Sequence, residues 1–342
     1  MIVEQFPDRI IKIENQNFLY FGGTCYLGLP SNKAFQKILI QNIKKWGTSY
    51  GSSRNANIQL SAYENAEKYL AKHIQSQSAL TVSSGTLAGK LVIEQLTIDE
   101  NIFFHLPNHH NAIQKLGSLP VFIGGKLNQK LLDSKVEKIT ILTDAVPTSE
   151  VKPIDLSFID EISNQKEITL LIDESHSFGI LGENGSGLYG SISNVNIKNK
   201  IMISSLGKAY GITGGVIAGN LDFINSIKYL PNYVSAAGMN PAFAQTIPDA
   251  VSIYLKQFEK LRQNLNFIHT HLKKNPSIDF DLNYPIIYPK QEKINEILKE
   301  NKIIITNFKY PNDLGYLNRI VITANHRKSD LKKLISILNK SY

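Results

Sequence analysis

The stretch ITLLIDESHSFGILGENGSGLYG, residues 168–190, decides the expected fold. It opens with the apolar run Ile168–Ile172 and turns polar at Asp173 and His176. A short apolar run that is bounded by polar and glycine-rich sequence predicts a buried strand. Ligands of α/β sheets gather beyond the carboxyl ends of such strands. We therefore expect Asp173 and His176 to lie at a functional site.

A second stretch, KIMISSLGKAYGITGGVIAGN at residues 200–220, repeats this pattern. Its run Ile201–Ile203 predicts another buried strand, which leads to Lys208 in a turn of small residues. An acid at one strand end and a lysine at the next favour pyridoxal 5′-phosphate (PLP). This cofactor needs a lysine for covalent attachment and an Asp, here Asp173, to keep its ring nitrogen protonated. Taken singly, Asp173 is equally well explained as a turn former and Lys208 as a surface lysine.

Two neighbouring side chains complete the expected cofactor site. His176 lies three residues after Asp173, where an imidazole suits the phenolic oxygen of the cofactor ring. Ser205 lies three residues before Lys208, where a hydroxyl suits the phosphate.

Both stretches together resemble the signature of the α-oxoamine synthases. The likeness runs through DESHSFGILGENGSG at residues 173–187 and SSLGKAYGITGGVIAG at residues 204–219, and extends from about Phe18 to the end of the chain. This family includes 8-amino-7-oxononanoate synthase and belongs to the PLP-dependent enzymes of fold type I, aminotransferase class I/II. The resemblance implies an α/β fold with a mostly parallel, doubly wound sheet and a smaller α+β C-terminal domain.

We expect the chain to divide into an N-terminal arm at residues 1–30, a large PLP-binding domain at 31–250 and a small domain at 251–342. Strands that alternate with helical stretches as far as Gly219 favour a mostly parallel sheet. A lysine-rich helical segment at residues 254–273 then precedes short strands and further helices, which is typical of an α+β domain.

Composition narrows the class of protein. The chain has 342 residues, of which 42% are hydrophobic, enough for a large core. Its net charge is +8, but the basic residues are spread along the chain, which disfavours nucleic-acid binding. The single cysteine, Cys25, excludes an internal disulfide and fits a reducing compartment. No signal peptide or membrane-spanning run is predicted, so we expect a cytoplasmic protein.

A phosphate site is expected after the short strand at residues 79–82. Ser84, Gly85 and Thr86 follow that strand and open a helix. The N-terminus of a helix binds anions through its free backbone N–H groups. The resemblance implies that the cofactor phosphate binds there. An ordinary serine N-cap fits the same residues.

The segment HLPNHHNAIQKLG, residues 105–117, resembles the part of the family sequence that stacks an imidazole on the cofactor ring. His110 is the expected residue, and a slip of one position would make it His109. Its three histidines do not predict a metal site, because zinc needs three or four converging ligands and no cysteine is near.

Substrate contacts are implied at three positions. Arg319, in LNRIVITANHRKSDLKKLISIL at residues 317–338, matches the family arginine that pairs with the substrate carboxylate, a task that its planar fork suits. Tyr26 lies in CYLGLPSN, near the substrate in the family, and Arg54 is suited to an anion. The chain departs from the family at four positions, which are Cys25, Ile58, Tyr63 and Ala237.

The resemblance implies a decarboxylating condensation of a small amino acid with an acyl-CoA or acyl-carrier-protein thioester, as in 8-amino-7-oxononanoate synthase. Lys208, His110 and Asp173 are the expected catalytic residues, with Lys208 as general base. A homodimer with shared active sites is also implied. Two alternatives stay open: an aminotransferase or aldolase of the same fold, and a non-catalytic partner subunit, against which the presence of Lys208 argues.

Overall fold

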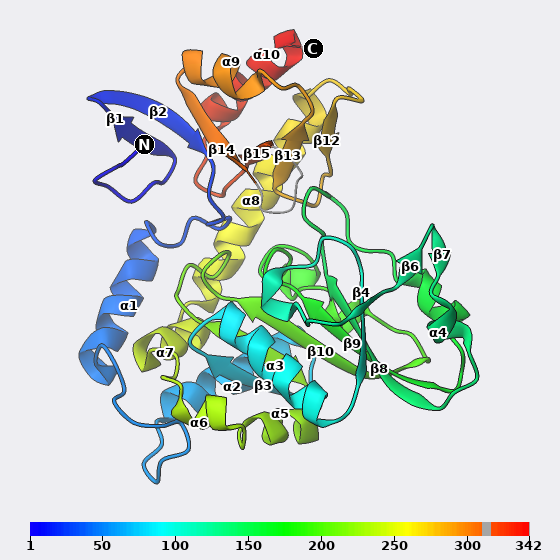
Figure 1. The fold of residues 1–342 in the computed structure, drawn as a ribbon. Helices are drawn as coiled ribbons and strands as arrows, with labels where there is room; N and C mark the ends of the chain where they lie inside the picture. Colours follow the sequence, from blue (N-terminus) through cyan, green and yellow to red (C-terminus); the bar gives the residue numbers. More distant parts are fainter. Residues whose placement is uncertain (310–315, 342) are drawn as a thin grey trace.

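The computed structural model describes residues 1–309 and 316–341. A seven-stranded sheet lies at the centre of the larger part of the molecule (Figure 1). Its order is β3-β11-β10-β9-β8-β4-β5. The strands are β3 (Ser78–Val82), β4 (Ile102–His105), β5 (Leu119–Pro120), β8 (Glu137–Asp144), β9 (Lys166–Asp173), β10 (Ile197–Ser205) and β11 (Gly215–Gly219). The pairs from β10 through β5 are parallel, whereas β11 is antiparallel to both β10 and β3. The carboxyl ends of the parallel strands therefore meet at one edge.

Helices cover both faces of this sheet, as a doubly wound fold requires. The side chains of Ile201 and Ile203 on β10 pack in one cluster with α3 (Gly85–Ile98), α5 (Leu221–Ile227) and α6 (Pro231–Ser235). Met202, between them, points to the opposite face and joins the core with α2 (Ser61–Ile74), α7 (Pro241–Asp249) and α8 (Val251–His271). Successive strand residues alternate between faces, and this alternation explains why the run is apolar throughout.

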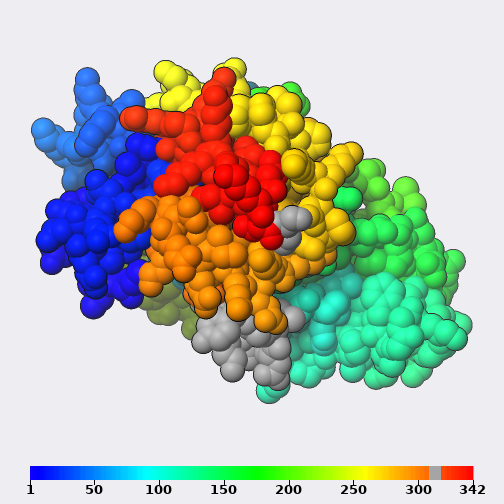
Figure 2. All heavy atoms as spheres, turned by 90° about the horizontal axis from the view of Figure 1, so that it is seen from above, coloured from blue at the N-terminus to red at the C-terminus, as the bar shows by residue number. Residues whose placement is uncertain are grey.

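A smaller, six-stranded sheet combines the two ends of the chain. Its order is β1-β2-β14-β15-β13-β12. The strands are β1 (Ile10–Ile13), β2 (Gln16–Phe21), β12 (Ile278–Phe280), β13 (Ile286–Pro289), β14 (Ile303–Lys309) and β15 (Tyr316–Val321). β2 pairs with β14 in parallel, and Figure 2 shows the N-terminal segment beside the C-terminal one. α8 runs from the larger part towards the smaller sheet in Figure 1.

The predicted arm is therefore not a free extension, because β1 and β2 are strands of the smaller sheet. The domain boundaries at residues 30 and 250 stay a prediction. Of the small domain expected at 251–342, residues 310–315 and 342 lie outside the described residues.

The remaining elements connect the sheets or lie at their margins. They are α1 (Lys33–Trp46), α4 (Gln129–Leu132), α9 (Ile294–Glu300), α10 (Lys328–Ser341), the hairpin β6 (Phe122–Ile123) and β7 (Lys126–Leu127), and 3-10 turns at Asn111–Ile113, Ser157–Glu161, Glu183–Gly185 and Tyr189–Ser191. The strands and helices that the sequence predicted are confirmed within a few residues. Across the described residues, no helix is both long and apolar enough to cross a membrane.

Candidate active site

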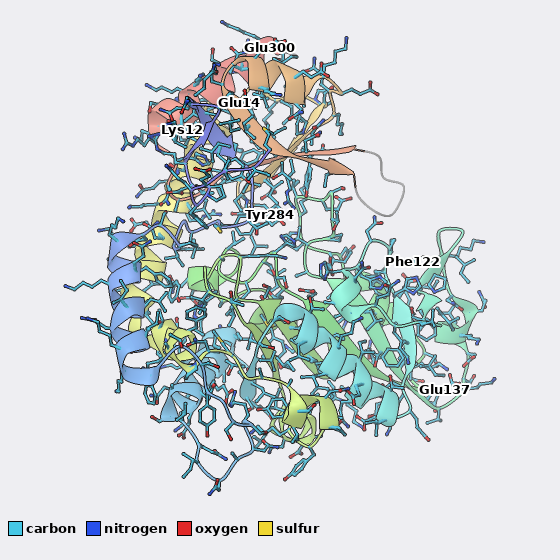
Figure 3. All side chains as sticks on the ribbon, turned by 60° about the vertical axis from the view of Figure 1, so that its left-hand side comes forward. Lys12, Glu14, Phe122, Glu137, Tyr284 and Glu300 are labelled. Atoms are coloured by element: carbon cyan, nitrogen blue, oxygen red, sulfur yellow. The ribbon has the colours of Figure 1, made fainter. Side chains whose placement is uncertain are left out.

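The candidate site lies at the carboxyl edge of the larger sheet, where the smaller sheet approaches it. Asp144 and Asp173 end β8 and β9, and Lys208 follows the end of β10. Arg319 comes from β15 of the smaller sheet. Figure 3 shows Tyr284 between the two parts of the molecule. Its pKa is raised chiefly by burial and is also influenced by Tyr26, Arg319 and Asp144.

Lys208 and His176 are in direct contact, as the sequence predicted for residues of one site. Lys208 Nζ lies 2.8 Å from His176 Nε2. His176 Nδ1 lies 2.8 Å from the hydroxyl of Tyr26, a side chain with no exposed surface. Tyr26 therefore lies at the site, where its hydroxyl contacts His176.

The amine of Lys208 loses its proton more easily than that of an ordinary lysine. Its pKa is about 8, lowered chiefly by burial and also by Arg319, while the carboxyls of Asp173 and Asp144 act to raise it. A lysine amine that loses its proton this easily is suited to act as a nucleophile or a general base.

His110, rather than His109, faces Asp173. His110 Nδ1 lies 3.8 Å from Asp173 Oδ2 and accepts a hydrogen bond from the backbone N–H of Ala112 at 3.1 Å. Burial lowers the pKa of His110, so its ring is neutral at pH 7. His109 instead points Nδ1 at the carbonyl of Leu106, 2.9 Å away. Of the two histidines, the structure brings His110 to Asp173, and its packing on a cofactor ring stays a prediction.

Asp173 is held from its own loop and from the neighbouring strand. Its Oδ1 accepts a hydrogen bond from the backbone N–H of Ser175 at 2.8 Å. The Ser175 hydroxyl accepts one from the N–H of Ser205 at 2.9 Å, which ties the ends of β9 and β10 together. Burial, followed by Asp173, raises the pKa of Asp144 well above its usual range. Asp144 therefore keeps its proton more readily than an exposed aspartate does.

The N-terminus of α3 has the form of an anion site. Ser84 is the N-cap, and its hydroxyl accepts a hydrogen bond from the N–H of Leu87 at 3.1 Å. The backbone N–H groups of Gly85 and Thr86 bond to no residue that the structure describes. A Cβ on Gly85 would lie 2.9 Å from the Cα of Ser205, so a glycine is needed to bring the helix to the end of β10. Ser84 is confirmed as an N-cap, and the phosphate cradle stays a prediction.

Arg319 contributes a positive charge from the smaller sheet. Its Nε is buried and has no hydrogen-bond partner within residues 1–309 and 316–341. Burial lowers the pKa of His176 well below its usual value, and the charges of Lys208 and Arg319 lower it further. An unpaired guanidinium N–H at this place is suited to a carboxylate.

Arg54 is not brought to this group of residues. Its guanidinium forms an ion pair with Glu67 at 2.8 Å and donates to the carbonyl and hydroxyl of Thr81 at 3.1 Å. It also lies 3.8 Å above the ring of Tyr63. The predicted role of Arg54 in substrate binding has no support from its contacts in this chain.

Two of the departures from the family pattern have structural partners. The Tyr63 hydroxyl donates to the carbonyl of Met239 at 2.7 Å. The thiol of Cys25 is half-buried, and burial followed by Asp8 raises its pKa, which leaves it protonated. Ile58 is exposed. No structural reason for Ala237 is evident.

Sequence reasoning missed Glu174, which organises the glycine-rich loop after β9. Glu174 is fully buried and accepts hydrogen bonds from the backbone N–H groups of Leu188 and Tyr189 and from the hydroxyl of Ser177, all at 2.7 Å. A second acid directly after Asp173, at the end of a buried run, was the available signal.

Comparison with known proteins gives one family match and several relatives. A model of the family "Aminotransferase class I and II" matches residues 25–338. The 8-amino-7-oxononanoate synthase of Petrotoga mobilis is 26% identical over 96% of this chain and 90% of its own.

Two solved structures share the fold. The serine palmitoyltransferase of S. paucimobilis with a bound PLP–myriocin aldimine has a TM-score of 0.81 at 16% identity, covering 99% of this chain and 91% of that one. The 8-amino-7-oxononanoate synthase of Francisella tularensis has a TM-score of 0.69 at 23% identity, covering 95% and 97%. At these identities, the two structures establish the arrangement of the backbone.

Proposed function

Since the chain belongs to the aminotransferase class I and II family and has the fold of the PLP-dependent enzymes of fold type I, we propose that it is a PLP-dependent acyltransferase. The proposed reaction is the decarboxylating condensation of a small amino acid with an acyl thioester, of the kind named for its relative 8-amino-7-oxononanoate synthase. The contact between Lys208 and His176, beside the buried carboxyl of Asp173, carries this proposal.

The residues present fit the cofactor. Lys208 has an easily deprotonated amine for covalent attachment, and Asp173 is a buried acid for the ring nitrogen. Ser84, Gly85 and Thr86 form a helix N-terminus with free N–H groups for the phosphate, next to Ser205. This is the donor set that PLP requires.

Bound PLP would supply an electron sink for the negative charge that develops at the α-carbon of an amino acid. Arg319 would bind the carboxylate of that amino acid through its free Nε–H. His110 would pack against the cofactor ring, with its Nδ1 fixed by the N–H of Ala112. Once its amine is free, Lys208 would hold or release the α-proton, which its pKa of about 8 permits near neutral pH.

The location and assembly belong to the proposal as well. We propose a cytoplasmic enzyme that acts as a homodimer, with active sites shared between the two chains. Sedimentation of the purified protein over a range of concentrations checks the assembly.

The test of function is a product assay on the PLP-loaded protein. Single small amino acids are offered with acyl-CoA donors of graded length, and release of coenzyme A and of carbon dioxide is measured. The proposal predicts equal release of both with one amino acid, lost in Lys208→Ala. If neither coenzyme A nor carbon dioxide is released and the cofactor is converted to its pyridoxamine form, the proposal is wrong and the protein is an aminotransferase. No PLP binding would favour a non-catalytic subunit.

A further inference from the structure

Three side chains from separate parts of the chain form a continuous line at the site. Tyr26 lies between β2 and α1, His176 follows β9, and Lys208 follows β10. The Tyr26 hydroxyl is 2.8 Å from His176 Nδ1, and His176 Nε2 is 2.8 Å from Lys208 Nζ. Both ring nitrogens of His176 are therefore engaged, each by a different partner.

Burial restricts the protonation of this line. It raises the pKa of Tyr26, so the hydroxyl keeps its proton. It lowers the pKa of His176 well below its usual value, with further lowering by Lys208, Arg319 and His110, so the ring is neutral. A neutral imidazole offers one donor and one acceptor, and a hydroxyl is able to serve either.

The state of Lys208 then selects the tautomer of His176. An ammonium only donates, so Nε2 must accept from it, and Nδ1 carries the ring proton and donates to the Tyr26 oxygen. A neutral amine is able to accept as well as donate, so Nε2 no longer has to be the acceptor. The Tyr26 hydroxyl then favours the tautomer with the proton on Nε2, because it donates to Nδ1. The proton that Lys208 loses goes to solvent, and the ring stays neutral throughout.

We propose that Tyr26 is a positioning residue, which holds the His176 ring against Lys208 and lets that ring change tautomer when Lys208 gains or loses a proton. Its hydroxyl fits this role because it is able to reverse from acceptor to donor. This role is separate from the substrate contact that the sequence predicted for Tyr26. It concerns hydrogen bonds within the chain and does not depend on the proposed acyl transfer.

Other titratable groups face the line from every side. Asp173 from β9 and Asp144 from β8 face Lys208, and Arg319 from β15 faces Lys208 as well. Arg319, Tyr288 and Cys25 face Tyr26. These groups are unchanged in a Tyr26→Phe variant, so any altered titration reports the loss of the hydroxyl alone.

Nitrogen NMR of the chain of 342 residues, freed of PLP and labelled with 15N-histidine, tests the proposal. The His176 signals are identified with a His176→Gln variant and followed between about pH 6 and pH 10, which brackets an amine of depressed pKa. The parent should change tautomer with a midpoint near pH 8 and no protonation of the ring. In Tyr26→Phe, the ring keeps the low-pH tautomer, which the Lys208 ammonium fixes, but loses the hydroxyl that favours a proton on Nε2 at high pH. The transition near pH 8 should therefore disappear.

The matched control is Tyr254→Phe. The Tyr254 hydroxyl is buried in the same core and has no hydrogen-bond partner among the described residues. This variant should keep the parent transition, and thermal unfolding of both variants checks that they are folded. The proposal would be overturned if Tyr26→Phe kept the tautomer transition of the parent. It would also be overturned if both phenylalanine variants lost that transition.

The PLP-loaded protein gives a second readout. The pH profile of its visible absorbance should shift in Tyr26→Phe and not in Tyr254→Phe. Turnover, a readout that rests on the proposed function, should fall in Tyr26→Phe with little change in KM for the amino acid. An unchanged absorbance profile would contradict the positioning role.

Discussion

Asp144 and Asp173 are register partners at the carboxyl ends of β8 and β9, two neighbouring parallel strands. Both side chains are buried. Like charges this close disfavour double ionisation. Asp144, whose pKa is raised well above its usual range by burial and then by Asp173, therefore holds its proton to a higher pH than an exposed aspartate does. The pair leaves one negative charge to balance Lys208.

Substitutions of Asp144 should separate its charge from its role as an acceptor. Its Oδ1 accepts the backbone N–H of His110 at 2.9 Å. Asp144→Asn keeps that acceptor, and should unfold within about 1 kcal/mol of the parent, whereas Asp144→Ala leaves the N–H unpaired and should lose about 1–3 kcal/mol. Denaturant unfolding at pH 7 measures both. Equal losses in the two variants would contradict the role of Asp144 as an acceptor for the His110 N–H.

Gly85→Ala should weaken the binding of PLP. The added Cβ would meet the Cα, Cβ and N of Ser205 at 2.9 Å, and backbone atoms move less easily than flexible side-chain ends. We expect the dissociation constant to rise tenfold or more, which is at least about 1.4 kcal/mol. Fluorescence titration with PLP measures it. Gly51→Ala is the control, because a Cβ there meets nothing within 4 Å.

The layout of the fold was predictable from particular runs of sequence. The apolar segments before Asp173 and Ser204 are buried on both faces of a parallel sheet, and such strands appear as unbroken apolar runs. The pairing of β2 with β14 was not predictable. It joins residues nearly 300 positions apart, Leu19 with Ile303, and nothing in the local sequence at either end encodes its partner.

The site residues that could be predicted from the sequence are those that follow the end of a buried strand. Asp173, His176 and Lys208 were placed from their position after buried strands, and the contact of Lys208 with His176 agrees with this. Contacts across the fold were not predictable. Tertiary packing brings Arg54 to Glu67 and Thr81. It likewise brings Tyr26 to His176.

Glu174 should make stability depend on pH. Burial raises its pKa from 4.5 to about 7, although the hydroxyl of Ser177 and the N–H groups of Leu188 and Tyr189 oppose the shift. Between pH 4.5 and about pH 7, the folded chain binds more protons than the unfolded chain. The free energy of unfolding therefore falls as the pH rises through this range. Denaturant unfolding at several pH values should show this fall in the parent and a weaker one in Glu174→Gln. Equal slopes would contradict the assignment.

Arg54→Ala should lower stability. Its side chain and that of Glu67 are mostly buried, so removal of the guanidinium leaves the Glu67 carboxylate without its counter-charge. The N–H and hydroxyl of Thr81 still donate to that carboxylate at 2.8 Å. We expect a loss of about 2–3 kcal/mol in the free energy of unfolding. Lys68→Ala removes an exposed ion pair with Glu64 and should change nothing measurable. Full stability of Arg54→Ala, with weaker substrate binding, would restore the role predicted from sequence.

The most direct test of the central claim is to find which lysine carries the cofactor. The PLP-loaded protein is reduced with borohydride, digested, and its labelled peptide identified by mass spectrometry. Lys200 on β10 is the control, because burial also lowers its pKa, but its amine donates to the carbonyls of Tyr189 and Ile192. We predict a label on Lys208 in the parent and in Lys200→Ala, and none in Lys208→Ala. A label on another lysine, or no label on the parent, would contradict the account.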